Sequence, residues 1–172
     1  MAEVKTKTME ELFRDIRTLN NAAGNTPMSP SDDNYWADLK RQADLIQSEL
    51  NETFEAIELK DLNKLRDGAC DVEVTNKGLF HRASIPFNQD MSVVVDALYS
   101  RFCKTEQEAK ETMEHYRTIG VETHSVDHEE TGYIVILSSK DQTGTDGEEY
   151  PEGKWLKSVY RKKPKFDESL MG

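Results

Sequence analysis

The chain has 172 residues, 32% of them charged, and its formal net charge at pH 7 is −11. This excess of negative charge disfavours non-specific binding to nucleic acid and to anionic membranes, so neither is an expected partner. No apolar stretch approaches the roughly twenty residues of a membrane span, and residues 1–10 lack the apolar centre of a signal peptide. The cytoplasm is therefore the expected location. Apolar residues spread along most of the length indicate a folded domain with a modest core.

The first half of the chain has the periodicity of helices. Residues 8–23 carry apolar side chains near helical spacing, and Gly24 follows as a candidate C-cap. From residue 31 or 34, apolar positions three and four apart continue to residue 57, which predicts one long helix. A second long helix is predicted from residue 62 to about 81, and a third core helix over 89–102. Together these segments predict a bundle of three or four helices.

The second half differs in kind. Residues 105–116 predict a charged helix with Thr105 as N-cap and Glu108 at the capping-box position. Residues 121–126 and 133–137 predict the two strands of a hairpin. We expect three parts: a helical core at 1–103, a helix plus β-hairpin at 104–140, and a mobile loop with a basic tail at 141–172 that belongs to the same domain.

Cysteines and histidines give no sign of a metal site. Cys70 and Cys103 lack metal-ligand spacing, and a reduced pair is favoured over a disulfide. The four histidines, which also lack ligand spacing, are expected at the surface or in loops: His81, His115, His124 and His128.

Two acidic clusters lie on the two long predicted helices. Glu49, Glu52 and Glu55 form the first cluster, and Asp67 and Asp71 form the second. Residues three or four apart share one face of a helix, so each helix presents a column of carboxylates. Antiparallel packing across the break near residues 60–61 would aim both columns at one point. Like charges so arranged repel, and a hard divalent cation such as Mg²⁺ relieves that repulsion.

A glutamate run on a helix is more commonly a solvated face, and that alternative stands for the first cluster taken alone. Three features favour a site. The glutamates lie beside the apolar stripe, a second acidic pair follows on the next helix, and Gly68 lies between the two aspartates. Glycine inside a helix costs roughly 1 kcal/mol against alanine. Gly68 therefore indicates the close approach of a backbone or a ligand.

These residues resemble the MazG-like all-α nucleoside triphosphate pyrophosphohydrolases, which include relatives of phosphoribosyl-ATP pyrophosphohydrolase. That family carries Glu-x-x-Glu on one helix and acidic-x-x-Asp or acidic-x-x-x-Asp on the next. Glu49 with Glu52 and Asp67 with Asp71 match these two halves. Gly78 falls where the family's second helix has a glycine. The likeness spans most of the chain and is weakest over 104–150.

Other segments extend the resemblance. Residues 19–24 look like the family's N-terminal segment, and residues 100–102 and 153–157 resemble segments of phage and bacterial members. The chain departs from the pattern at Gly68, where the commoner spacing has an acid, and at Leu98, where an asparagine is frequent.

The resemblance implies a mainly α fold, a four-to-five-helix bundle with a small helix-plus-β-hairpin extension near the C-terminus. It implies hydrolysis of a (deoxy)nucleoside triphosphate to the monophosphate and pyrophosphate, by a homodimer or homotetramer. Mg²⁺, which Mn²⁺ can replace, would be held by Glu49, Glu52, Asp67 and Asp71. Glu52 or Glu55 would accept the proton of the attacking water. Likeness to phage-encoded members implies a role in shaping the dNTP pool for a modified genome, in the host cytoplasm.

Each candidate substrate contact also has a purely structural explanation. Phosphates need Lys or Arg, and the base needs stacking or amide partners, although a solvated surface suits the basic residues equally and a core position suits the tryptophan better. The candidates are Arg101, Lys154 and Lys157 for the phosphates, and Asn20, Trp36 and Asn76 for the base. The competing function is a non-enzymatic acidic helical module that binds a partner protein.

Overall fold

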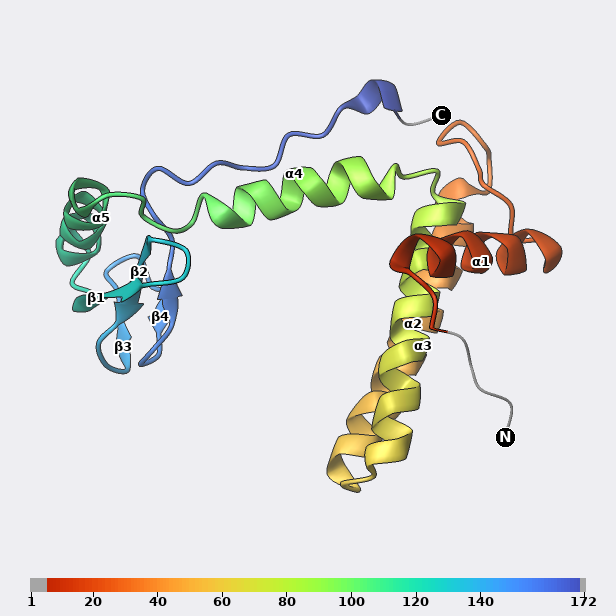
Figure 1. The fold of residues 1–172 in the computed structure, drawn as a ribbon, viewed down its shortest axis with the longest axis horizontal. Helices are drawn as coiled ribbons and strands as arrows, with labels where there is room; N and C mark the ends of the chain where they lie inside the picture. Colours follow the sequence, from red (N-terminus) through yellow and green to blue (C-terminus); the bar gives the residue numbers. More distant parts are fainter. Residues whose placement is uncertain (1–5, 171–172) are drawn as a thin grey trace. The chain divides into compact units, whose positions relative to one another are not determined.

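The computed structural model describes residues 6–170 and is mainly helical, with helices over 53% of the chain and small antiparallel strands towards the C-terminus (Figure 1). The coarse expectation of a mainly α fold with a late β-hairpin is thereby confirmed. The helices are α1 (Met9–Ala22), α2 (Tyr35–Glu58), α3 (Leu62–Arg82), α4 (Phe87–Tyr99) and α5 (Glu106–Thr118), and a 3₁₀ turn, η1, spans Glu168–Leu170. The strands are β1 (Thr123–His128), β2 (Tyr133–Ser138), β3 (Gln142–Thr143), β4 (Glu149–Tyr150) and β5 (Trp155–Leu156).

The chain divides into two compact units. One contains the residues up to Phe87 together with those from Asp167, and the other is Asn88–Phe166. The boundary expected at residue 103 lies inside the second unit. Helix α4 was expected to be a core helix of the bundle, but none of its residues is buried and all but its first belong to the second unit.

Local capping explains where the helices of the first unit begin and end. The Thr8 hydroxyl accepts from the Glu11 backbone N–H at 3.2 Å, and the Glu11 carboxylate accepts from the Thr8 N–H at 2.8 Å. This capping box starts α1. Gly24 follows the helix with φ +82°, the left-handed conformation that glycine adopts without strain. Asp61 caps α3 by accepting from the backbone N–H groups of Asn63 and Lys64.

Helices α2 and α3 form an antiparallel hairpin, and glycines set its spacing (Figure 1). A Cβ added at Gly68 would lie 2.8 Å from the Thr53 Oγ1 of α2. A Cβ at Gly78 would lie 3.1 Å from Gln42 Nε2, and 3.5 Å from Asn20 Oδ1 of α1. The close approach expected at Gly68 is thus the approach of a neighbouring helix. Gly78 plays the same part where α1, α2 and α3 meet.

In the second unit, helix α5 packs against a small antiparallel sheet. Strands β1, β2 and β5 form an antiparallel sheet in the order β1-β2-β5, with Thr123 opposite Ser138 and Ile136 opposite Leu156. The expected hairpin is confirmed. Helix α5 contacts β1 and β2, and its side chains contribute to a core made of Cys103, Ala109, Tyr116, Val121, Ile136, Tyr150 and Leu156.

The segment expected to be a mobile loop is instead folded. Strands β3 and β4 pair with Gln142 opposite Tyr150, and the Asp146 carboxylate accepts from the Tyr150 hydroxyl at 2.6 Å. The Ser138 hydroxyl donates to the Tyr150 carbonyl at 3.0 Å and ties this hairpin to the sheet. Composition alone does not reveal these longer-range bonds, so the strand pairing was not predicted from the sequence. The start of the basic tail is also folded, because Trp155 and Leu156 form strand β5.

No helix within residues 6–170 combines the length and the apolar composition needed to cross a bilayer. Cys70 is exposed and Cys103 is buried, and neither forms a disulfide within the described residues.

Candidate functional site

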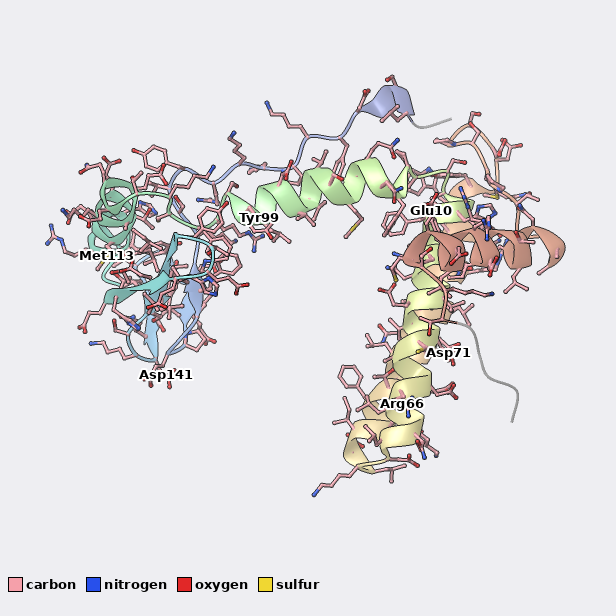
Figure 2. All side chains as sticks on the ribbon, viewed as in Figure 1. Glu10, Arg66, Asp71, Tyr99, Met113 and Asp141 are labelled. Carbon is pink, nitrogen blue, oxygen red and sulfur yellow. The ribbon has the colours of Figure 1, made fainter. Side chains whose placement is uncertain are left out.

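The two acidic clusters face one another across the α2–α3 hairpin. Partial burial, followed by the negative charges of Glu52, Asp71 and Asp67, raises the pKa of the Glu49 carboxyl above its ordinary value. Charges act this way only over short distances. Glu49 is therefore the centre of a group of four carboxylates, two from each helix. Figure 2 labels Asp71 on α3, with Arg66 nearer the turn of the hairpin.

The helix contact nearest the cluster explains how it is assembled. Thr53 lies one turn after Glu49 on α2, and its hydroxyl donates to the Glu49 carbonyl at 2.9 Å. The Thr53 side chain also meets α3 at Gly68, which directly follows Asp67 in the chain. Since a side chain at residue 68 would force the helices apart, Gly68 brings the two acidic columns within range of each other.

The negative charge of the four carboxylates is not balanced by a basic side chain. Among the ion pairs found within residues 6–170, none includes Glu49, Glu52, Asp67 or Asp71. Asp38 on the same helix shows the contrast, because it pairs with both Arg41 and Arg82. An uncompensated group of carboxylates is chemically suited to a cation.

The donor set fits Mg²⁺, whose preferred ligands are carboxylate oxygens. The carboxylates of Glu52, Asp67 and Asp71 act on Glu49, but the four do not converge on one point: in the described part of the chain, no three His, Cys, Asp or Glu side chains are arranged so that they could hold a metal ion. The structure brings together carboxylates of both helices, which offer the kind of oxygen atoms that Mg²⁺ prefers. Glu55 is exposed and is not among the charges that raise the pKa of Glu49.

The candidates for base recognition lie in the same unit as the carboxylates. The Asn20 side chain donates to the Ile16 carbonyl at 2.9 Å and lies beside Gly78. Asn76 is partly buried on α3. Trp36 is 75% exposed, so the core position that was favoured for it is wrong. Its ring packs edge-on against Tyr35, with the ring centroids 5.1 Å apart.

The candidates for phosphate binding lie in the second unit. Arg101 lies 6.0 Å from the ring centroid of Trp155. Lys154 lies 4.7 Å from the ring centroid of Tyr150 and donates to the Glu149 carbonyl at 2.5 Å. Lys157 follows β5 and is exposed. The assignment of these three residues to the carboxylate cluster remains a prediction.

The first unit contains a set of buried polar residues that was not predicted from the sequence. Asp38 is 6% exposed, and its hydrogen bond from Arg82, aided by Arg41, lowers the pKa of its carboxyl. Gln42 Nε2 donates to the Thr75 carbonyl at 2.8 Å. The helical spacing of Asp38 and Gln42, one turn apart beside Tyr35 in the apolar stripe, was the signal available for their burial.

Two further buried polar side chains lie where α1 meets α3. Lys77 lies 3.3 Å from the ring centroid of Phe87, a cation–π contact. His81, expected at the surface, is buried: its Nε2 lies 2.9 Å from Asn21 Oδ1, and burial lowers the pKa of the ring. The position of His81 on the inner face of α3 overrides the general polarity of histidine.

Comparisons of the chain with protein-family models, with curated proteins and with solved structures found no match.

Proposed function

We propose that the protein is a magnesium-dependent pyrophosphohydrolase of (deoxy)nucleoside triphosphates, with a first unit of the MazG-like helical type. The observation that supports the proposal is the group formed by Glu49, Glu52, Asp67 and Asp71. Partial burial, and then the other three negative charges, raise the pKa of the Glu49 carboxyl, and no basic side chain pairs with any of the four within residues 6–170. A structural helix face has no need of such an arrangement, which opposes folding.

The proposed ligands are carboxylates of this group, as the family resemblance implies. Glu49, Asp67 and Asp71 would hold Mg²⁺, and Glu52 would contribute an oxygen or remain free to accept a proton. When bound, Mg²⁺ neutralises phosphate oxygens and lowers the pKa of a coordinated water. Mn²⁺ has similar ligand preferences and would support the same reaction.

The proposed reaction is attack of water on the α-phosphorus. A new P–O bond forms at that atom, the bridging bond to the β-phosphate breaks, and pyrophosphate leaves with the bonding electrons. Glu52 accepts the proton from the water, because a carboxylate within hydrogen-bond reach is a suitable general base. Glu55, which is exposed and further from Glu49, is the second candidate for this role.

Substrate recognition would use both polar and aromatic groups. The exposed ring of Trp36 is available to stack on a base, and Asn20 and Asn76 offer amide groups in the same unit. Arg101, Lys154 and Lys157 of the second unit are the candidate phosphate contacts. Such an enzyme would shape the dNTP pool, as the likeness to phage-encoded members suggests for a modified genome.

The decisive experiment measures pyrophosphate release from each of the common NTPs and dNTPs, with Mg²⁺ or Mn²⁺. We expect turnover of at least one substrate, and loss of about 100-fold or more for Glu49→Gln and Asp71→Asn, since metal ligands support the chemistry directly. Glu58→Gln, on the same helix but outside the group of four, is the matched control and should retain activity. Release of no pyrophosphate from any of the substrates would eliminate the enzyme and leave the protein-binding module.

A further inference from the structure

The second unit contains a strongly basic groove, which includes two of the candidate phosphate contacts, Arg101 and Lys157. Its cavity of about 250 Å³ has apolar side chains of α4 on its floor, among them Val94 and Leu98. Five cationic residues line it: Arg101, Lys157, Arg161, Lys162 and Lys163. Not one of these five enters an ion pair with a carboxylate in the part of the chain that the structure describes. In a chain of net charge −11, such a concentration of unpaired cations marks a binding site for an anion.

The wall of this groove is held in place by hydrogen bonds. The Lys157 N–H donates to the Tyr116 hydroxyl at 3.1 Å, and the Ser158 N–H donates to the Arg101 carbonyl at 2.9 Å. The Lys162 N–H donates to the Ser100 hydroxyl at 2.7 Å. These bonds fix the backbone that carries the cations against the end of α4. A preorganised wall loses little conformational entropy when a ligand binds.

A second cavity, of about 390 Å³, adjoins the groove and shares Lys157 and Arg161 with it. Its lining combines aromatic, acidic and basic side chains, among them Tyr150, Trp155, Asp146 and Lys154. Its volume lies within the range of roughly 300–1,000 Å³ that is usual for small-ligand sites. Carboxylates repel phosphate but accept hydrogen bonds from the N–H groups of a base or the hydroxyls of a sugar. The two cavities therefore suit the two halves of one ligand.

We propose that the second unit binds a nucleoside polyphosphate without a metal ion, with the chain of phosphates in the basic groove and the nucleoside in the aromatic cavity. Lysine and arginine donate charge-assisted hydrogen bonds to phosphate oxygens, and the aromatic rings pack against the base. All the residues that line the two cavities belong to the second unit. The proposal does not rest on the proposed hydrolysis, because it requires neither Mg²⁺ nor turnover.

The test is equilibrium binding to the full chain by calorimetry, with each of the four dNTPs as ligand and EDTA present throughout. EDTA removes divalent cations, so binding at a metal-dependent cluster does not contribute. We expect at least one dNTP to bind, and inorganic pyrophosphate to bind the same site about tenfold or more weakly, because it leaves the aromatic cavity empty. Absence of binding by all four dNTPs overturns the proposal, and equal affinity for pyrophosphate overturns its nucleoside half.

Matched variants locate the site. The double variant Lys162→Gln/Lys163→Gln removes two cations of the groove and should weaken dNTP binding about tenfold or more. Lys104→Gln/Lys110→Gln removes the same charge from exposed positions of the same unit that line neither cavity, and should change the affinity by less than about twofold. Circular dichroism is used to check that both double variants are folded. Equal weakening by the two double variants, or by neither, overturns the proposal, as does tighter binding of a single-stranded oligonucleotide than of any dNTP.

Discussion

At the scale of single residues, Glu49 links the candidate site to the stability of the fold. Its pKa is raised in the folded chain, so the ionised carboxylate is less favourable there than in the unfolded chain. Well below the ordinary pKa of 4.5, the Glu49 carboxyl is protonated in both the folded and the unfolded chain, and it does not lower the free energy of unfolding. As the pH rises through the raised pKa, the folded state loses stability relative to the unfolded state.

Glu49→Gln should therefore raise the free energy of unfolding at pH 7 in the presence of EDTA, and have no such effect at pH 3. Urea unfolding at the two pH values measures this difference. Added Mg²⁺ should stabilise the wild type more than the variant, because a cation that binds only the folded state shifts its stability by mass action, by about 2.7 kcal/mol at a hundred times the dissociation constant. Destabilisation by Glu49→Gln at pH 7 would mean that the carboxylate is a structural group.

Asp38 is the opposite kind of residue. Arg82 and Arg41 lower the pKa of its carboxyl, so its contribution to stability is present above the ordinary value of 3.8 and is lost as the pH falls through the lowered pKa. Asp38→Asn leaves the nearly buried Arg82 without its anion and should cost about 3 kcal/mol at pH 7. Asp44→Asn, which breaks an exposed pair with Lys40 on the same helix, should cost less than about 1 kcal/mol. Similar losses for both variants in urea unfolding would contradict this account.

At the scale of elements, the spacing of α2 and α3 depends on Gly68. In an isolated helix Gly68→Ala would gain roughly 1 kcal/mol. In this hairpin the new Cβ would lie 2.8 Å from Thr53 Oγ1 and 3.4 Å from the Thr53 backbone, so we expect a net loss of about 1–2 kcal/mol and weaker Mg²⁺ binding as the acidic columns separate. Thermal unfolding with and without Mg²⁺ measures both effects.

Thr53→Ala distinguishes a clash with the Thr53 side chain from a clash with the Thr53 backbone. The substitution removes Oγ1, the atom that would lie nearest to a Cβ at residue 68, and leaves the backbone contact in place. The double variant Thr53→Ala/Gly68→Ala should recover part of the stability that Gly68→Ala loses, since the Thr53 hydroxyl bonds only to a carbonyl of its own helix. A strictly additive loss in this double-mutant cycle would show that the two residues do not contact one another.

Elements with local signals were predictable from the sequence. The long helix α2 follows from unbroken apolar spacings of three and four, α3 follows from a similar but less complete pattern, and the β1–β2 hairpin follows from two short strand-forming segments joined through Gly132. Because the acidic columns depend only on helical period and a short turn, it was predictable that carboxylates of both helices act on Glu49, but their expected convergence on one point is not seen in the described residues. What was not predictable rests on distant bonds. Strand β5 has two residues, and the order of residues 141–153 depends on Ser138 and Tyr150. Periodicity does not detect either feature.

At the scale of the whole molecule, the first unit leaves much of its apolar surface uncovered. Around the turn between α2 and α3, four large apolar side chains are each more than half exposed: Phe54 at 55%, Ile57 at 52%, Leu59 at 59% and Leu62 at 68%. We call these four residues the tip patch. The broad apolar stripe that predicted a buried α2 is thus only half satisfied within one chain. A second copy of the chain, joined through a symmetric contact, would bury the same patch on both subunits.

We therefore expect a homodimer or homotetramer in solution, measured by sedimentation equilibrium. Each subunit contributes its patch, and burying a large apolar side chain is worth about 1.5–3 kcal/mol, so Phe54→Ser/Ile57→Ser should weaken association by about 100-fold or more. Val126→Ser/Val159→Ser removes two exposed valines of the second unit and serves as the control, which should associate like the wild type. At a protein concentration of about 0.1 mM, a dissociation constant of about 10 μM is easily detected. A wild type that stays monomeric at that concentration would contradict the homo-oligomer. Association lost equally in both variants would place the subunit contact outside the tip patch.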